Sequence, residues 1–116
     1  MLPPSVRIWV CTVPQDMRRS FDTLALVTQQ ILGLDPQSGS LYVFLGKRLT
    51  RAKVLWWDKN GYCLLYKRLH RAHFSLPSTV PGEGPAIRID ANALSQLLAG
   101  VTREKSSCRG LTRDRR

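Results

Sequence analysis

Acidic residues are scarce in this chain of 116 residues, where 8 Asp and Glu stand against 18 Lys and Arg and leave a formal net charge of +10. A protein with this charge attracts polyanions, of which nucleic acid is the commonest. Cationic surfaces also serve solubility, so charge alone does not establish such a partner.

Long hydrophobic runs are absent as well, because no apolar stretch approaches the ~20 residues that a membrane-spanning helix needs. The opening segment MLPPSVRIWV has two prolines where a secretory signal would have a basic start. We therefore expect a soluble, cytoplasmic protein that has no membrane partner.

Cysteine and histidine are few, which limits disulfide and metal chemistry. Cys11, Cys63 and Cys108 are far apart and form no CxxC pair, which argues against a disulfide framework and a zinc knuckle. His70 and His73 would lie on opposite faces of a strand, an arrangement that suits a metal site poorly. We expect buried or idle thiols in a reducing compartment and no bound metal.

The groups that an enzyme needs are missing too. The GEG at residues 82–84 lacks the rest of a nucleotide-binding fingerprint, and no Ser or Cys nucleophile pairs convincingly with a His. The aspartates are scattered over expected turns and helix caps, where each has a structural duty: Asp16, Asp22, Asp35, Asp58 and Asp90. We expect no catalytic residues and no cofactor.

Apolar periodicity predicts two helices. Residues 16–33, DMRRSFDTLALVTQQILG, carry apolar side chains at spacings of three and four, and Gly33 is typical of a helix C-cap. This pattern predicts one long helix whose apolar stripe docks on a sheet. A short C-terminal helix is predicted in ANALSQLLAG, with Asp90 as its N-cap and Gly100 at its end.

The remaining periodic segments are typical of strands. Residues 6–12 alternate in polarity, and Leu41–Leu45 is apolar throughout, as expected of an inner strand. Two β-rich runs flank Asp58–Gly61, where Asn-Gly predicts a type I′ hairpin turn, so residues 40–68 should form three consecutive antiparallel strands. Short strands are predicted in RAHFSLP and in IRID.

These elements predict an α+β fold, with a mostly antiparallel sheet, the long helix on one face and the short C-terminal helix. The length allows one domain with a modest core. We expect a single domain over residues 1–101 and a basic, disordered tail over residues 102–116.

Side chains alternate along a strand, so the predicted hairpin has two different faces. One face is aromatic and basic, and it carries Lys53, Leu55, Trp57, Tyr62, Leu64, Tyr66 and Arg68. The other is more aliphatic and is expected to receive the stripe of the long helix; it carries Val54, Trp56, Cys63, Leu65 and Lys67.

Aromatic side chains interleaved with Lys and Arg are what single-stranded nucleic acid needs, since bases stack and phosphates require cations. The alternative is that the aromatics are hairpin core and the cations a solvated face. The candidate nucleic-acid-binding residues are Arg18, Arg19, Lys47, Arg48, Arg51, Lys53, Trp57, Tyr62, Tyr66, Lys67, Arg68 and Arg71.

Arg18 and Arg19 are a special case, because they are predicted in the first turn of the long helix, where the helix dipole disfavours cations. Their presence there indicates a phosphate or carboxylate of a partner. Pairing with Asp16 and Asp22 at helical spacing would explain them equally well.

Several motifs together carry a family resemblance. The most specific are DMRR at 16–19 followed by FD at 21–22, VLWWD at 54–58 with Gly61, and KRL at 67–69. In this order and spacing, the chain resembles the small accessory protein TnpB of the insertion sequence 66 family of bacterial transposable elements.

The resemblance spans about residues 3–101 and implies an auxiliary role in transposition beside a separate, larger DDE-type transposase. It departs from the family at His70, where an acidic residue is expected, and at 74–77, where FSLP replaces Phe-x-Trp-Pro. Two hypotheses follow. The chain binds the DNA of the element ends directly, or it is an adaptor that docks on the transposase or another accessory subunit. The oligomeric state stays open.

Overall fold

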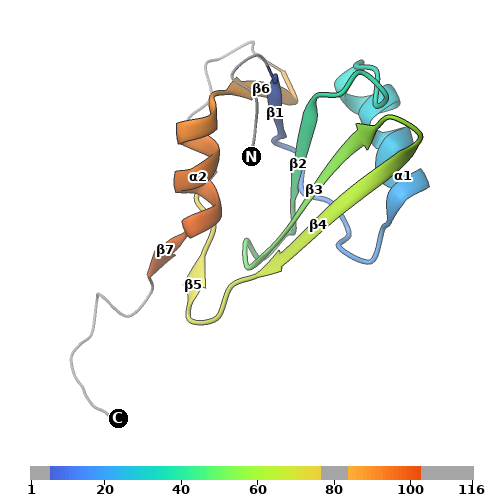
Figure 1. The fold of residues 1–116 in the computed structure, drawn as a ribbon. Helices are drawn as coiled ribbons and strands as arrows, with labels where there is room; N and C mark the ends of the chain where they lie inside the picture. The colour runs from blue at the N-terminus through green and yellow to red at the C-terminus, as the bar shows by residue number, and fades with distance from the viewer. Residues whose placement is uncertain (1–5, 77–83, 103–116) are drawn as a thin grey trace, which may run out of the picture.

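A computed structural model describes residues 6–76 and 84–102 of the chain. Five strands form the main sheet, in the order β4-β3-β2-β1-β6, and two short strands form a second sheet (Figure 1). All neighbours pair antiparallel except β1 and β2, which are parallel. The main strands are β1 (Ile8–Cys11), β2 (Leu41–Leu45), β3 (Arg51–Asp58), β4 (Gly61–Arg68) and β6 (Ala86–Ile89); the small sheet pairs β5 (Ala72–His73) with β7 (Val101–Thr102).

The structure confirms the α+β class but shortens the first helix. The α-helix α1 covers Phe21–Val27 and continues as one π-helical segment, η1, over Thr28–Leu32. Gly33 ends it in the left-handed conformation at a φ of 69°, as expected. The second helix, α2, covers Ala91–Ala99, and the Asp90 side chain accepts a hydrogen bond from the backbone N–H of Ala93 at 2.7 Å, which confirms the predicted cap.

The prediction of a long helix beginning at Asp16 was wrong. The Asp16 carboxylate accepts a bond from the backbone N–H of Arg18 at 2.9 Å, and its carbonyl accepts one from the N–H of Arg19. Aspartate often closes such a local turn, and the turn competes with helix formation. Ser20 then has an extended backbone, so the helix begins only at Phe21.

The three antiparallel strands predicted between residues 40 and 68 are present, and β2 is an inner strand as expected. The detail of the hairpin turn differs. Asp58 pairs with Gly61, so Gly61 already belongs to β4 and the loop is Lys59 and Asn60. A type I′ turn centred on Asn60 and Gly61 would give these two residues a positive φ. In the structure it is Lys59 that has a positive φ, of 56°.

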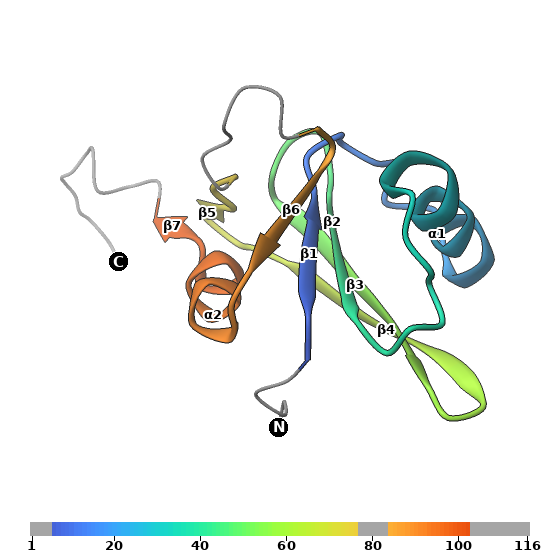
Figure 2. The ribbon, with the colours of Figure 1, turned by 90° about the horizontal axis from the view of Figure 1, so that it is seen from above.

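Helices cover both faces of the sheet, α1 on one side and α2 on the other (Figure 2). The core under α1 joins Leu24 to Tyr42, Phe44 and Leu55, all of them buried. The core on the opposite face groups buried side chains of the sheet, of α2 and of the segment after β5: Ile8, Val10, Leu41, Val43, Leu45, Ala52, Val54, Phe74, Leu94 and Leu97.

The predicted hairpin faces are present in the strand register, but the assignment of the first helix to them was wrong. Leu55, of the aromatic and basic face, packs under α1, whereas Val54 lies in the core with α2, and Trp56 packs against that core. The side on which a helix crosses between parallel strands is set by the handedness of the β1-α1-β2 connection. The composition of a hairpin farther along the sheet does not decide it.

The predicted tail falls almost entirely outside the described residues. Thr102, its first residue, pairs with Ala72 in the small sheet, so the boundary expected after residue 101 lies within β7. Among the described residues, no helix combines the length and apolar composition that a bilayer crossing requires.

Candidate nucleic-acid interface

A cationic hollow lies between the β2–β3 turn and the segment that precedes α1. The turn is closed by the N–H of Gly46, which donates to the carbonyl of Arg51 at 2.9 Å, and Leu49 within it has a φ of 60°. A cavity of about 320 Å³ opens here, lined by Gln15, Asp16, Met17, Gly46, Lys47, Arg48, Thr50 and Arg51.

Close packing brings the two segments of this hollow together. A Cβ atom on Gly46 would lie 2.9 Å from the Cγ of Met17, so glycine lets the buried Met17 side chain approach the turn directly. Lys47 and Arg48 are both exposed. The packing therefore presents two cations of the turn beside the polar side chains that precede α1.

Two arginines face each other at the neighbouring end of the hairpin. Arg51 of β3 is the direct cross-strand partner of Arg68 of β4, and both residues are exposed. Like charges directly opposite each other destabilise a sheet. Within residues 6–76 and 84–102, neither arginine forms an ion pair with a carboxylate. An external anion would relieve this repulsion.

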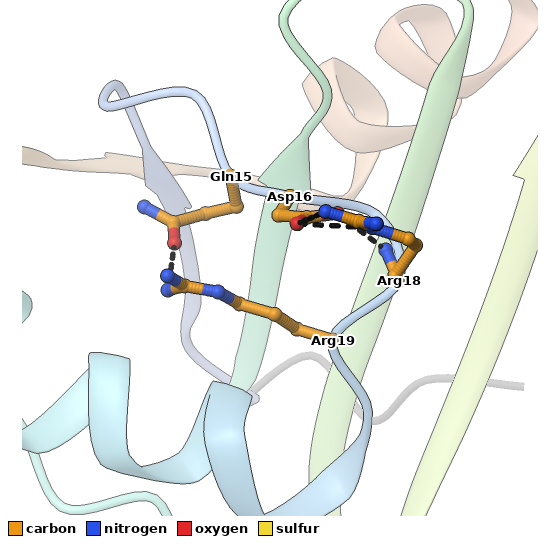
Figure 3. A network of polar contacts seen from close by, with 4 residues as sticks. All are labelled: Gln15, Asp16, Arg18 and Arg19. Atoms are coloured by element: carbon orange, nitrogen blue, oxygen red, sulfur yellow. Dashed lines mark hydrogen bonds and ion pairs between the residues drawn. The ribbon is translucent and has the colours of Figure 1, made fainter.

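The segment before α1 contains a small polar network (Figure 3). The Arg18 guanidinium donates to both carboxylate oxygens of Asp16, with the closest contact at 2.8 Å from Nη2 to Oδ2. These bonds hold the pKa of Asp16 well below its usual range. Nη1 of Arg19 donates to Oε1 of Gln15 at 3.0 Å. Two explanations follow from the sequence for Arg18 and Arg19: an anion of a partner, or pairing with nearby aspartates. The structure shows the second for Arg18, which pairs with Asp16, whereas the partner of Arg19 is the neutral Gln15.

Lys53 lies beneath this segment rather than on the surface. Lys53 is only 6% exposed, and its Nζ donates a hydrogen bond to the backbone carbonyl of Arg19 at 2.6 Å. The same ammonium lies 4.8 Å from the ring centroid of Tyr66. In this position Lys53 holds the Arg18–Arg19 turn against the sheet, so its expected contact with a phosphate does not fit the structure.

We predict that Lys53→Met destabilises the domain by roughly 1–3 kcal/mol, because it leaves the Arg19 carbonyl without a donor. The salt dependence of nucleic-acid binding should stay unchanged, since a buried ammonium does not neutralise a phosphate. Urea unfolding and a salt titration of binding measure the two effects. Lys59→Met, at the exposed hairpin loop, is the matched control and should leave both near wild type; a salt slope reduced only by Lys53→Met would contradict the structural role.

Lys67 and Arg71 do not lie on the face of the hairpin that carries Arg51 and Arg68. Lys67 points to the other face of the sheet, where its Nζ donates to the carbonyl of Leu98 at 2.8 Å. A cation is favourable at that C-terminal end of α2. Arg71 is exposed at the bend before β5 and has a φ of 61°.

The predicted aromatic residues divide into two places. Trp57 and Tyr62 are half-buried and meet edge to face near the hairpin tip, with ring centroids 4.9 Å apart. Tyr66 is 51% exposed and lies two residues from Arg68 on β4, two cross-strand pairs from the Arg51–Arg68 pair. Trp57 lies six residues from Arg51 on β3, which is about 20 Å along the strand. The Trp57–Tyr62 pair is therefore far from the two arginines, whereas Tyr66 is close to them.

The sequence did not indicate the polar lining of the hollow. Gln15 and Thr50 are far apart in the chain, and neither residue type is distinctive alone. Their meeting depends on the turn at Asp16 and on the packing of Met17 against Gly46. In the described part of the chain, no three His, Cys, Asp or Glu side chains are grouped so as to hold a metal ion.

Comparison with known proteins places the chain in a family. The family model described as IS66 Orf2 like protein matches residues 6–107. The chain belongs to the IS66 Orf2-like family. Membership implies an accessory role associated with transposition.

Two relatives come from Sinorhizobium fredii, and both carry the description uncharacterized protein. The protein y4hO is 46% identical over 103 residues, which cover 87% of this chain and 87% of the relative. The protein y4jC is 34% identical over 103 residues, covering 87% and 86%. No solved structure matches the chain significantly.

The two departures from the family pattern both lie at the surface. His70 is exposed, and Leu76, which stands where Trp was expected, is 38% exposed. Phe74, the aromatic residue that agrees with the expected segment, is fully buried in the core with α2. The departures therefore alter the exterior near β5 and leave the shared core position intact.

Proposed function

We propose that this chain is a non-enzymatic accessory factor that binds element DNA during transposition in the bacterial cytoplasm. The proposed contact surface, called here the basic end of the hairpin, comprises Lys47, Arg48, Arg51 and Arg68. The other side of the hollow is lined by Gln15 and Asp16, which accept hydrogen bonds from Arg19 and Arg18.

The observation that carries the proposal is the direct opposition of Arg51 and Arg68. A sheet gains nothing from two guanidinium groups at one cross-strand position, and the described residues supply no acid for either. Phosphate oxygens accept bonds from guanidinium groups in a geometry that suits them well. The net charge of +10 adds a long-range attraction for the same ligand.

An adaptor role is the second candidate, and a different surface favours it. Phe21, Leu26 and Ile31 of the α1–η1 segment are 43%, 48% and 39% exposed. Large apolar side chains of this kind anchor protein interfaces, and they lie outside the basic end of the hairpin. A partner such as the transposase could contact these three exposed side chains.

A mobility-shift experiment with DNA of the element ends separates the two functions. We expect the purified chain to retard the DNA without the transposase and to leave it uncut in the presence of Mg²⁺. Retardation that requires the transposase would favour the adaptor. Metal-dependent cutting that disappears in an Asp16→Asn or Asp58→Asn variant would overturn the non-enzymatic assignment.

A further inference from the structure

We infer that the basic end of the hairpin takes single-stranded nucleic acid, with a phosphate between Arg51 and Arg68 and a base stacked on Tyr66. This inference rests on the proposed function and adds the form of the ligand. Tyr66 and Arg68 are two residues apart on β4, so their side chains share one face of the sheet, and Arg51 pairs with Arg68 on that face.

The exposure of Tyr66 distinguishes it from the other aromatic residues of the hairpin. The residue is 51% exposed, whereas Trp57 and Tyr62 are half-buried and pack against each other. In the neighbouring pair, Leu55 is buried in the core beneath α1 and Leu64 packs against that core. Tyr66 is therefore the aromatic residue of this face that lies beyond the cover of the helix.

Lys53 positions the Tyr66 ring. Its ammonium lies 4.8 Å from the ring centroid and is itself held by the carbonyl of Arg19. A cation over an aromatic face attracts the ring electrostatically. A ring that is already held in place loses less conformational freedom when a base stacks on it, which favours binding.

The edge position of β4 leaves room for an extended strand. In the described residues β4 pairs only with β3, so no further strand lies along its outer side. Tyr66 and Arg68 are about 7 Å apart along the strand. A base on the ring and the phosphate of an adjacent nucleotide can therefore be bound side by side.

The combination selects single strands for a physical reason. Cations attract the phosphates of single-stranded and duplex DNA alike. Stacking on a side chain requires a base whose face is free, and the bases of a duplex are already stacked on their neighbours. Tyr66 therefore strengthens the binding of a single strand and leaves duplex binding to the cations.

Fluorescence anisotropy with the full chain tests this inference. The probes are a labelled single strand of mixed sequence and the duplex formed with its complement, both at the same salt concentration. Tyr66→Leu is expected to weaken single-strand binding by about 5- to 100-fold. Duplex binding should change less than about twofold, because stacking on Tyr66 makes no contribution there. Tyr66→Phe keeps the aromatic face and should bind the single strand like wild type.

The outcomes separate this inference from the proposed function. The stacking site would be overturned if Tyr66→Leu weakened the binding of both probes equally. It would also be overturned if the wild-type protein bound the duplex as tightly as the single strand. In both cases the proposed cationic surface would remain supported. Binding of neither probe at low salt would overturn both. Circular dichroism of the two variants shows whether each keeps the fold.

Discussion

Arg51→Gln combined with Arg68→Gln is expected to weaken DNA binding by about 10- to 100-fold at ~0.1 M salt. Each arginine that neutralises one phosphate adds about 0.9 to the slope of log K against log salt on duplex, and about 0.7 on a single strand. Removing both should flatten the measured slope by roughly one to two units. Titrations at several salt concentrations give both quantities from one set of samples.

The matched control removes the same charge from the other edge of the sheet. Arg88 lies on β6, beside Trp9, and Arg7 comes just before β1; both are exposed. Neutralising Arg7 and Arg88 lowers the net charge equally but should leave the slope nearly unchanged. Equal losses in the two double variants would indicate attraction by overall charge, with no defined contact at the hairpin.

The same double variant should not lose stability, and this separates a binding role from a structural one. Because Arg51 and Arg68 are like charges in direct opposition, their neutral replacement is expected to leave the unfolding free energy unchanged or to raise it by roughly 0.2–1 kcal/mol. Arginines kept for the fold would show the opposite sign. A pair that lowers stability and has no carboxylate partner among residues 6–76 and 84–102 is best explained by an external anion.

The tail provides a further control on the same measurement. Residues 103–116 carry six basic and two acidic side chains. Truncation after Thr102 keeps β7 intact and removes that charge. If truncation abolished binding while the Arg51 and Arg68 variant bound normally, the folded domain would be an adaptor and the DNA affinity would belong to its basic arm.

Local patterns predicted the parts of this fold that local chemistry determines. Leu41–Leu45 is an inner strand because every side chain is apolar, and Asp90 caps a helix because its carboxylate reaches a free N–H. The cross-strand register of the hairpin followed from a two-residue loop. Alternation along the strand then predicts Tyr66 and Arg68 on one face, and the register adds Lys53 to that face.

Two of the errors concern features set by distant parts of the chain. The face that α1 covers depends on the crossover between parallel strands, which hairpin composition does not report. Lys53 looked like a surface cation because its burial depends on the Arg19 carbonyl, 34 residues away. The predicted helix start failed for a local reason, since Asp16 can cap a turn as readily as a helix.

Phe74→Ala is expected to lower the free energy of unfolding by roughly 3–5 kcal/mol. Phe74 is fully buried in the core between the sheet and α2, where Ala52, Leu94 and Leu97 surround the same space. The loss is a large fraction of the about 5–15 kcal/mol that stabilises a typical domain. Urea unfolding, followed by the fluorescence of the three tryptophans, measures it.

Leu76→Ala is the matched control for this truncation, because it removes a large side chain two residues away that is 38% exposed. Its expected effect is within about 1 kcal/mol. Phe74 also connects the segment after β5 to the basic end of the hairpin. Its backbone N–H donates a hydrogen bond to the carbonyl of Leu49 at 2.6 Å, and Leu49 lies in the turn that contains Lys47 and Arg48. Alanine keeps this backbone N–H, so the bond is lost only when the segment unfolds, and DNA binding should fall at temperatures where the variant begins to unfold. If Phe74→Ala were as stable as Leu76→Ala, the segment after β5 would not be part of the core, and the surface near Leu76 would be independent of the hairpin.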